Sequence, residues 1–165
     1  MTRVALFFLS CLLFSGAVGA EDLKTYWNPK YPYGIAYPSS WTITTVGTFM
    51  EQDTFSVMNG ANDVNINVMA NQVSLENRGR YRSITDIPNA MKELSDVIRT
   101  QNGSSAIQSG TTLVSNEPAL WFKYFRVHRS LSQEVWFAIY QLSSLRNDVT
   151  YTITGRFQVP SATGG

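Results

Sequence analysis

Residue types suited to catalysis are scarce in this chain. His128 is the only histidine, and it stands close to Arg126 and Arg129 in a predicted hairpin turn. A serine hydrolase would place a histidine beside a nucleophile, and the sequence contains no Gly-x-Ser-x-Gly motif. We therefore expect no catalytic residue, and a hydrolase that uses His128 with an unrecognised carboxylate is the least favoured alternative.

Metal and cofactor sites are equally poorly supported. The single cysteine, Cys11, lies in the N-terminal apolar segment, which leaves one histidine to form a zinc site. The acidic pair Glu51 and Asp53 lacks the spacing of a calcium-binding EF-hand loop. Glycine-rich phosphate-binding loops are absent too. The sequence predicts no metal and no cofactor.

Three arginines form a candidate binding loop. Arg78, Arg80 and Arg82 alternate with a glycine and a tyrosine in a stretch without clear periodicity. Guanidinium groups bind carboxylates and phosphates through paired hydrogen bonds, so this loop would suit an anion or an acidic partner. A mobile, solvated loop is the alternative interpretation.

A second candidate surface lies in residues 119–157, which hold much of the aromatic content of the chain. Three consecutive antiparallel strands are predicted there, at 119–127, 135–142 and 149–157, joined by short turns. Apolar side chains occupy both alternating sets of positions in the first two strands, whereas a sheet with one wet face has polar residues on one set. Both faces are therefore expected to need a cover.

One set of these aromatic residues is the candidate partner surface. Its members are Trp121, Phe125, Trp136 and Tyr140. An exposed apolar patch is typical of an interaction site, although aromatic residues in a sheet are more often covered within their own molecule. A missing helix, the segment 21–32 or a partner protein could provide the cover.

The elements that position these residues follow from the rest of the pattern. Strands are predicted at 33–37, 41–46, 48–58, 64–71, 105–108 and 111–115. Apolar residues at helical spacing between Ile87 and Ile98 predict one α-helix, with Asp86 as its cap and Pro88 in its first turn.

The N-terminus has the pattern of a secretory signal peptide. Arg3 precedes an apolar run from Val4 to Phe14, and small residues lead to a cleavage site after Ala20. The run is too short for a transmembrane helix, and a lipid anchor at Cys11 fits its surroundings poorly. We expect a signal peptide at 1–20, a leader at 21–32, one domain at 33–159 and a flexible tail at 160–165.

Composition limits the partners and the compartment. Without Arg3, the chain has 12 basic and 12 acidic residues, so it has no charge excess that would favour nucleic acid. An extracellular or periplasmic location is expected, or the thylakoid lumen in a photosynthetic organism. Asn102 would accept a glycan only in a eukaryotic secretory pathway.

The segment Tyr33-Gly-Ile-Ala-Tyr-Pro-Ser-Ser-Trp41 resembles the aromatic-Gly-x-x-x-x-Pro-x-x-Trp opening of the PsbP-like superfamily. Leu113-Val-Ser-Asn-Glu-Pro-Ala119 is similar to the turn that leads into its aromatic strand. The resemblance covers residues 33–157. It implies an α+β fold, an α-β-α sandwich around a central antiparallel sheet, and a role in binding proteins rather than in catalysis.

The family typically ends in a helix after the strand that corresponds to 149–157. This sequence departs from the family there, because residues 160–165 are rich in helix breakers, and the resemblance leaves open whether a C-terminal covering helix is present or absent. We therefore expect an exported, non-enzymatic binding or assembly protein with an unknown protein partner. The alternative is a carrier of a small apolar ligand or lipid, in a pocket between sheet and helix lined by Met91, Leu94, Phe122 and Phe137.

Overall fold

The structure, a computed structural model, describes residues 22–49, 52–61, 64–101, 103–129 and 133–160. Several expectations lie outside these residues: the signal peptide at 1–20, the lipid anchor at Cys11, the glycan site at Asn102 and the tail beyond Pro160.

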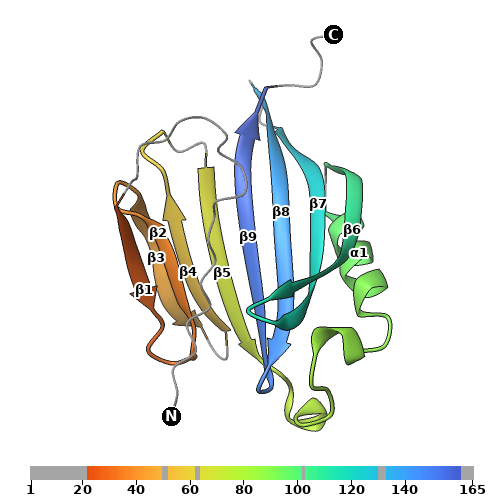
Figure 1. The fold of residues 1–165 in the computed structure, drawn as a ribbon. Helices are drawn as coiled ribbons and strands as arrows, with labels where there is room; N and C mark the ends of the chain where they lie inside the picture. The colour runs from red at the N-terminus through yellow and green to blue at the C-terminus, as the bar shows by residue number, and fades with distance from the viewer. Residues whose placement is uncertain (1–21, 50–51, 62–63, 102, 130–132, 161–165) are drawn as a thin grey trace.

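The described chain is built around a seven-stranded antiparallel sheet with the strand order β3-β4-β5-β9-β8-β7-β6 (Figure 1). Its strands are β3 (Thr42–Phe49), β4 (Gln52–Met58), β5 (Val64–Gln72), β6 (Ser104–Val114), β7 (Glu117–Arg129), β8 (Glu134–Arg146) and β9 (Val149–Val159). The chain forms β3 to β5 as hairpins, crosses one face of the sheet, and returns through β6 to β9, where β9 pairs with β5.

The crossover contains one α-helix. Two short 3-10 helices, η1 (Leu75–Asn77) and η2 (Ile84–Asp86), precede α1 (Ala90–Thr100). The helix that the sequence predicts is present, but it starts later than expected. Asp86 completes a capping box with Ser83 on η2, and Asn89 in a left-handed conformation begins α1 without a side-chain cap. Asp86 is therefore not the cap of α1.

One core lies between α1 and the sheet face that we call the helix face. It joins Ile98 of α1 and Ile84 of η2 to side chains of β7 and β8. The sheet contributes Leu120, Phe122, Tyr124, Ile139 and Leu145. These positions alternate along their strands, as the sequence pattern predicts for one face of a sheet.

A second core lies on the opposite face, which we call the hairpin face. Strands β1 (Leu23–Trp27) and β2 (Gly34–Pro38) form a separate antiparallel hairpin. Its tyrosines pack on β4, β5 and the start of β9. The buried members are Tyr31, Tyr33, Ile35, Tyr37, Phe55, Val57, Val68, Ala70, Val149 and Tyr151.

The prediction of an α-β-α sandwich is wrong. The described residues are mostly β, with a single helix on one face and a β-hairpin on the other. The difference arises from the segment 21–32, for which the sequence predicts a leader along the surface. Its residues Leu23 to Trp27 pair with β2, and the resulting hairpin covers part of the second face, for which a helix, this segment or a partner were the alternatives.

Candidate functional site

The four aromatic residues proposed from the sequence lie on one face of the neighbouring strands β7 and β8. The register pairs Lys123 with Tyr140, Phe125 with Ala138, and Val127 with Trp136. Paired residues share a face, and so do alternate residues of one strand. Trp121, Phe125, Trp136 and Tyr140 therefore all lie on the hairpin face, and we call them the aromatic surface.

The aromatic surface is half-buried. Each of its four side chains is partly exposed, and none belongs to either of the two cores. The β1–β2 hairpin packs on β4, β5 and β9, to one side of this surface. These four side chains are therefore less buried than the two cores but are not fully exposed to solvent.

Neighbouring side chains hold the aromatic surface in place. The Lys123 ammonium lies 5.4 Å from the centre of the Tyr140 ring, and this ring meets Phe157 edge to face at 5.9 Å. The Trp121 indole lies against Gly110 on β6, where a Cβ atom would be 2.7 Å from its Nε1. The Lys123 cation and the rings of Tyr140 and Phe157 therefore adjoin each other at this surface. Aromatic residues are enriched at protein interfaces, whereas lysine is depleted there, so the aromatic residues carry the likeness to an interface.

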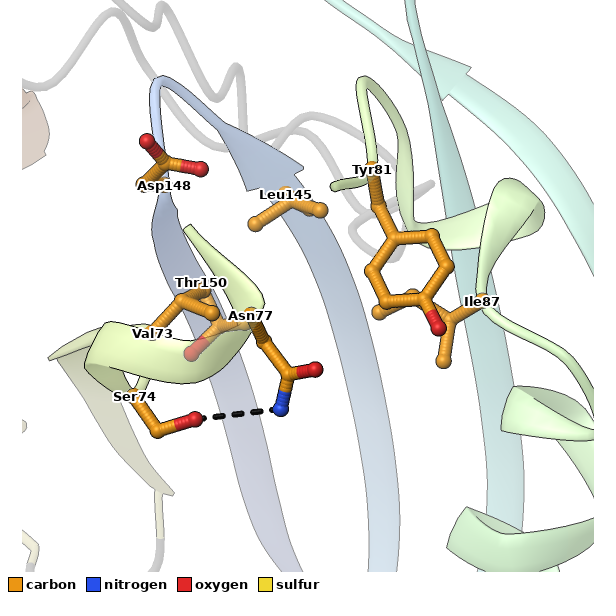
Figure 2. A pocket seen from close by; sticks show the side chains of 8 residues that line it. All are labelled: Val73, Ser74, Asn77, Tyr81, Ile87, Leu145, Asp148 and Thr150. Atoms are coloured by element: carbon orange, nitrogen blue, oxygen red, sulfur yellow. Dashed lines mark hydrogen bonds between the residues drawn. The ribbon is translucent and has the colours of Figure 1, made fainter. Parts of the chain in front are cut away.

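The arginine loop borders a pocket on the other side of the sheet, at the end where β8 turns into β9 (Figure 2). The pocket has a volume of about 270 Å³ and a mainly apolar lining. Its walls come from three parts of the chain: the start of the crossover, the segment around η2, and the β8–β9 hairpin. The lining residues are Val73, Ser74, Asn77, Tyr81, Ile87, Leu145, Asp148 and Thr150.

Two of the three predicted arginines contact residues that line this pocket. The Arg78 Nε donates a hydrogen bond to the Val73 carbonyl oxygen at 3.3 Å. The Arg80 Nη1 donates to the Asn77 Oδ1 at 3.4 Å, and its guanidinium lies 5.3 Å from the centre of the Tyr81 ring. Arg82 is exposed, and its backbone N–H donates to Asp86.

The structure does not bring the arginines and the aromatic surface together. Leu145 and Thr150, which line the pocket, lie on the helix face, whereas the aromatic surface lies on the hairpin face. The seven residues proposed from the sequence therefore belong to two separate places.

Sequence reasoning missed the wall of the pocket that the β8–β9 hairpin supplies. The Asp148 carboxylate accepts a hydrogen bond from the Gly79 backbone N–H at 2.7 Å, and the Asp148 carbonyl accepts one from Val73 at 2.8 Å. The available signal was Asn147-Asp148, a pair that tolerates the positive φ angles of a tight hairpin turn. That signal predicts a turn, but it does not show which loop the turn contacts.

The four residues proposed to line a carrier pocket belong to the core between α1 and the sheet. Phe122 is buried, and Met91, Leu94 and Phe137 pack against the same core between α1 and the sheet. None of these four lines the pocket of Figure 2.

His128 lies exposed near the end of β7, opposite Val135, and its ring forms no hydrogen bond with another described residue. Within the part of the chain that the structure describes, no three acidic, histidine or cysteine residues gather as a metal site would need. The same part contains no helix with the length and apolar character needed to cross a membrane.

No protein-family model matches the chain, and no curated protein is similar to it. Among solved structures, the chain is similar to the solution structure of cyanobacterial PsbP (CyanoP) from Synechocystis sp. PCC 6803. The sequence identity is 17%, the TM-score is 0.49, and the match covers 91% of this chain and 87% of that one. Membership of the PsbP-like superfamily stays a prediction.

Proposed function

We propose that this protein is an exported, non-enzymatic binding protein that acts through contacts with another protein, and that the aromatic surface is its main contact. The observation that carries the proposal is the partial exposure of Trp121, Phe125, Trp136 and Tyr140 on one sheet face, outside both cores. Tryptophan and tyrosine contribute more than most residues to the binding energy of protein interfaces.

Export is the other part of the proposal. It rests on the apolar run Val4–Phe14 and the small residues before Glu21, a pattern typical of cleaved signal peptides. N-terminal sequencing of the protein purified from its native cell tests this part. A mature chain that begins at Glu21 supports export, and a chain that keeps its first 20 residues in the cytoplasm contradicts it.

Chemical cross-linking in the native envelope, followed by capture of the tagged protein, tests the contact surface. Trp121→Ala and Trp136→Ala each remove a large ring from the aromatic surface, and we expect each to reduce the captured partner. Trp27→Ala is the matched control, because Trp27 is 45% exposed on β1 and lies outside the aromatic surface. Unchanged capture by both folded variants would exclude this surface as the contact.

A further inference from the structure

We propose that the pocket between the crossover and the β8–β9 hairpin binds an acidic segment of a protein partner, which inserts one bulky apolar side chain. We call the eight lining residues of Figure 2 with Arg78 and Arg80 the loop site. The inference rests on the proposed binding function in one respect only, that the partner is a protein. The loop site would be a second contact, on the helix face, whereas the aromatic surface lies on the hairpin face.

The size of the pocket favours part of a ligand over a whole one. Sites that enclose a drug-sized molecule have volumes of roughly 300–1,000 Å³. The loop site, at about 270 Å³, lies just below this range. Leu145, Ile87 and Val73 make most of its surface apolar, and this surface suits a single leucine, phenylalanine or similar side chain.

The positive charge of the arginines favours acidic residues on either side of the inserted apolar side chain of the partner. Arg78, Arg80 and Arg82 are exposed, and none of their guanidinium groups forms an ion pair with a carboxylate among the described residues. Arg78 and Arg80 are each held by a hydrogen bond to a residue of the pocket wall. A carboxylate beside the inserted side chain would find a cation at the rim, with the paired geometry that guanidinium offers.

The nearby carboxylates limit where a negative charge can lie. Asp148 accepts the Gly79 N–H, and Asp86 accepts the N–H groups of Arg82 and Ser83, so both are directed at the backbone of the loop. Both still repel an anion, and Glu76 is exposed on η1. The negative residues of the partner must therefore lie on the arginine side of the rim and not beside Asp148, with an apolar group inside.

The loop is organised before any partner arrives. Gly79 has a φ of 69°, which places its N–H against Asp148, and the Ser83–Asp86 capping box fixes the residues after Arg82. Because binding then orders little additional chain, less of the interaction energy is lost to conformational entropy. A loop of this kind can recognise a short segment of modest contact area.

Titration with synthetic peptides, followed by amide NMR signals of Gly79 and Asp148, tests the inference. The probe is a peptide with one phenylalanine flanked on both sides by aspartates. Its matched controls replace the phenylalanine by alanine or the aspartates by lysines. We expect the acidic phenylalanine peptide alone to shift these signals, with a Kd of about 1 mM or tighter. Binding should weaken as ionic strength rises from about 0.01 M to about 0.15 M, because the Debye length falls from about 30 Å to 8 Å.

Two protein variants separate the charge from the pocket. Arg78→Gln with Arg80→Gln should weaken binding by roughly fivefold, as expected for the loss of two exposed ion pairs. Lys24→Gln with Arg99→Gln removes two exposed cations outside the loop site and should leave the affinity unchanged. Asn77→Phe places a ring in the pocket and should abolish the shifts. Thermal unfolding of each variant verifies the fold, and the exposed arginine pair provides the test if Asn77→Phe does not fold.

Three results would overturn the inference: no binding of the acidic phenylalanine peptide, equal binding of the lysine peptide, or binding of decanoate in its place. The last would indicate a small-molecule site. Each leaves the aromatic surface untested, and capture through Trp121 and Trp136 can fail or succeed independently. The two proposals are therefore distinguishable.

Discussion

The side-chain amide of Asn28, in the turn of the β1–β2 hairpin, donates a hydrogen bond to the buried carboxylate of Asp53 on β4. The Asn28 Oδ1 also accepts the backbone N–H groups of Lys30 and Tyr31 at 2.8 and 2.7 Å. One asparagine thus shapes the turn of the hairpin and fixes it to the large sheet. The contact explains how a segment that looks like an irregular leader becomes part of the fold.

Removal of the Asp53 carboxylate should destabilise the protein. Asp53 is 4% exposed, so Asp53→Ala would leave the Asn28 amide without this acceptor in a mostly buried place. We expect a loss of about 1–3 kcal/mol in the free energy of unfolding, measured by urea denaturation. Asp96→Ala is the control, because Asp96 forms only exposed, solvent-screened ion pairs on α1, and its loss should lower the stability less than Asp53→Ala does. Equal losses in the two variants would show that the Asn28–Asp53 contact contributes little.

Two buried tyrosines make stability sensitive to alkaline pH. Burial raises the pKa of Tyr33 far above its ordinary value of 10 and raises the pKa of Tyr151 to about 12. The unfolded chain ionises both groups near pH 10, so the free energy of unfolding should be unaffected below that pH and should fall as pH rises toward 12 and beyond. Each tyrosine can contribute up to about 1.4 kcal/mol per pH unit.

Urea denaturation at a series of alkaline pH values measures this fall. The Tyr33→Phe, Tyr151→Phe variant should lose less stability over the same range, because it lacks the two hydroxyl groups. Parallel pH profiles of the two proteins would contradict the assignment to these tyrosines.

The periodicity of the sequence predicts the helix and most of the strands, but it does not predict which element packs on each face of the sheet. The helical spacing between Ile87 and Ile98 and the alternation of aromatic residues in 119–142 are local patterns, and both elements are present. Which element covers which sheet face depends on contacts such as Asn28–Asp53, 25 residues apart in the sequence. No local pattern records such a contact, so the sequence named the segment 21–32 only as one of three possible covers and did not predict that it forms a hairpin with β2.

Strand β6 shows the same limit at a single residue. The sequence predicted two short strands around Gly110, whereas the structure has one strand with an irregular register between Ser105 and Gln108. Ala106, inside this irregularity, has a φ of 50°, which alanine rarely adopts. The pairing with β7 holds the strand together across that point, and residue type alone did not indicate it.

The sequence predicts the arginines of the loop site but not its pocket. The arginines and their preference for an acidic partner follow from residue type, whereas the pocket forms only where Gly79 meets Asp148, 69 residues later.

Loss of a phenylalanine ring should affect stability on one face of β7 and partner binding on the other. Phe122 is 1% exposed on the helix face, so Phe122→Ala should cost about 3–5 kcal/mol in the free energy of unfolding. Phe125, three residues later on the hairpin face, is half-buried and should cost clearly less when replaced by alanine. We expect only Phe125→Ala to stay well folded and to lose partner capture. A Phe125→Ala variant as unstable as Phe122→Ala would identify the aromatic surface as core.

A methyl group at Gly110 should disturb the aromatic surface without altering any of its residues. A Cβ atom there would lie 2.7 Å from the Nε1 and 2.9 Å from the Cε2 of Trp121, so the indole must move. Gly47 on β3 is the matched control, because a Cβ atom at that position meets nothing within 4 Å. We expect Gly110→Ala to shift the tryptophan fluorescence maximum and to weaken partner capture, and Gly47→Ala to change neither.

Either substitution also restricts the unfolded chain, which favours folding by about 0.4–1 kcal/mol. Because this gain is common to both variants, a lower stability of Gly110→Ala relative to Gly47→Ala would measure the steric cost of the added methyl group. Identical spectra of the two variants would mean that Trp121 does not rest on Gly110 in solution.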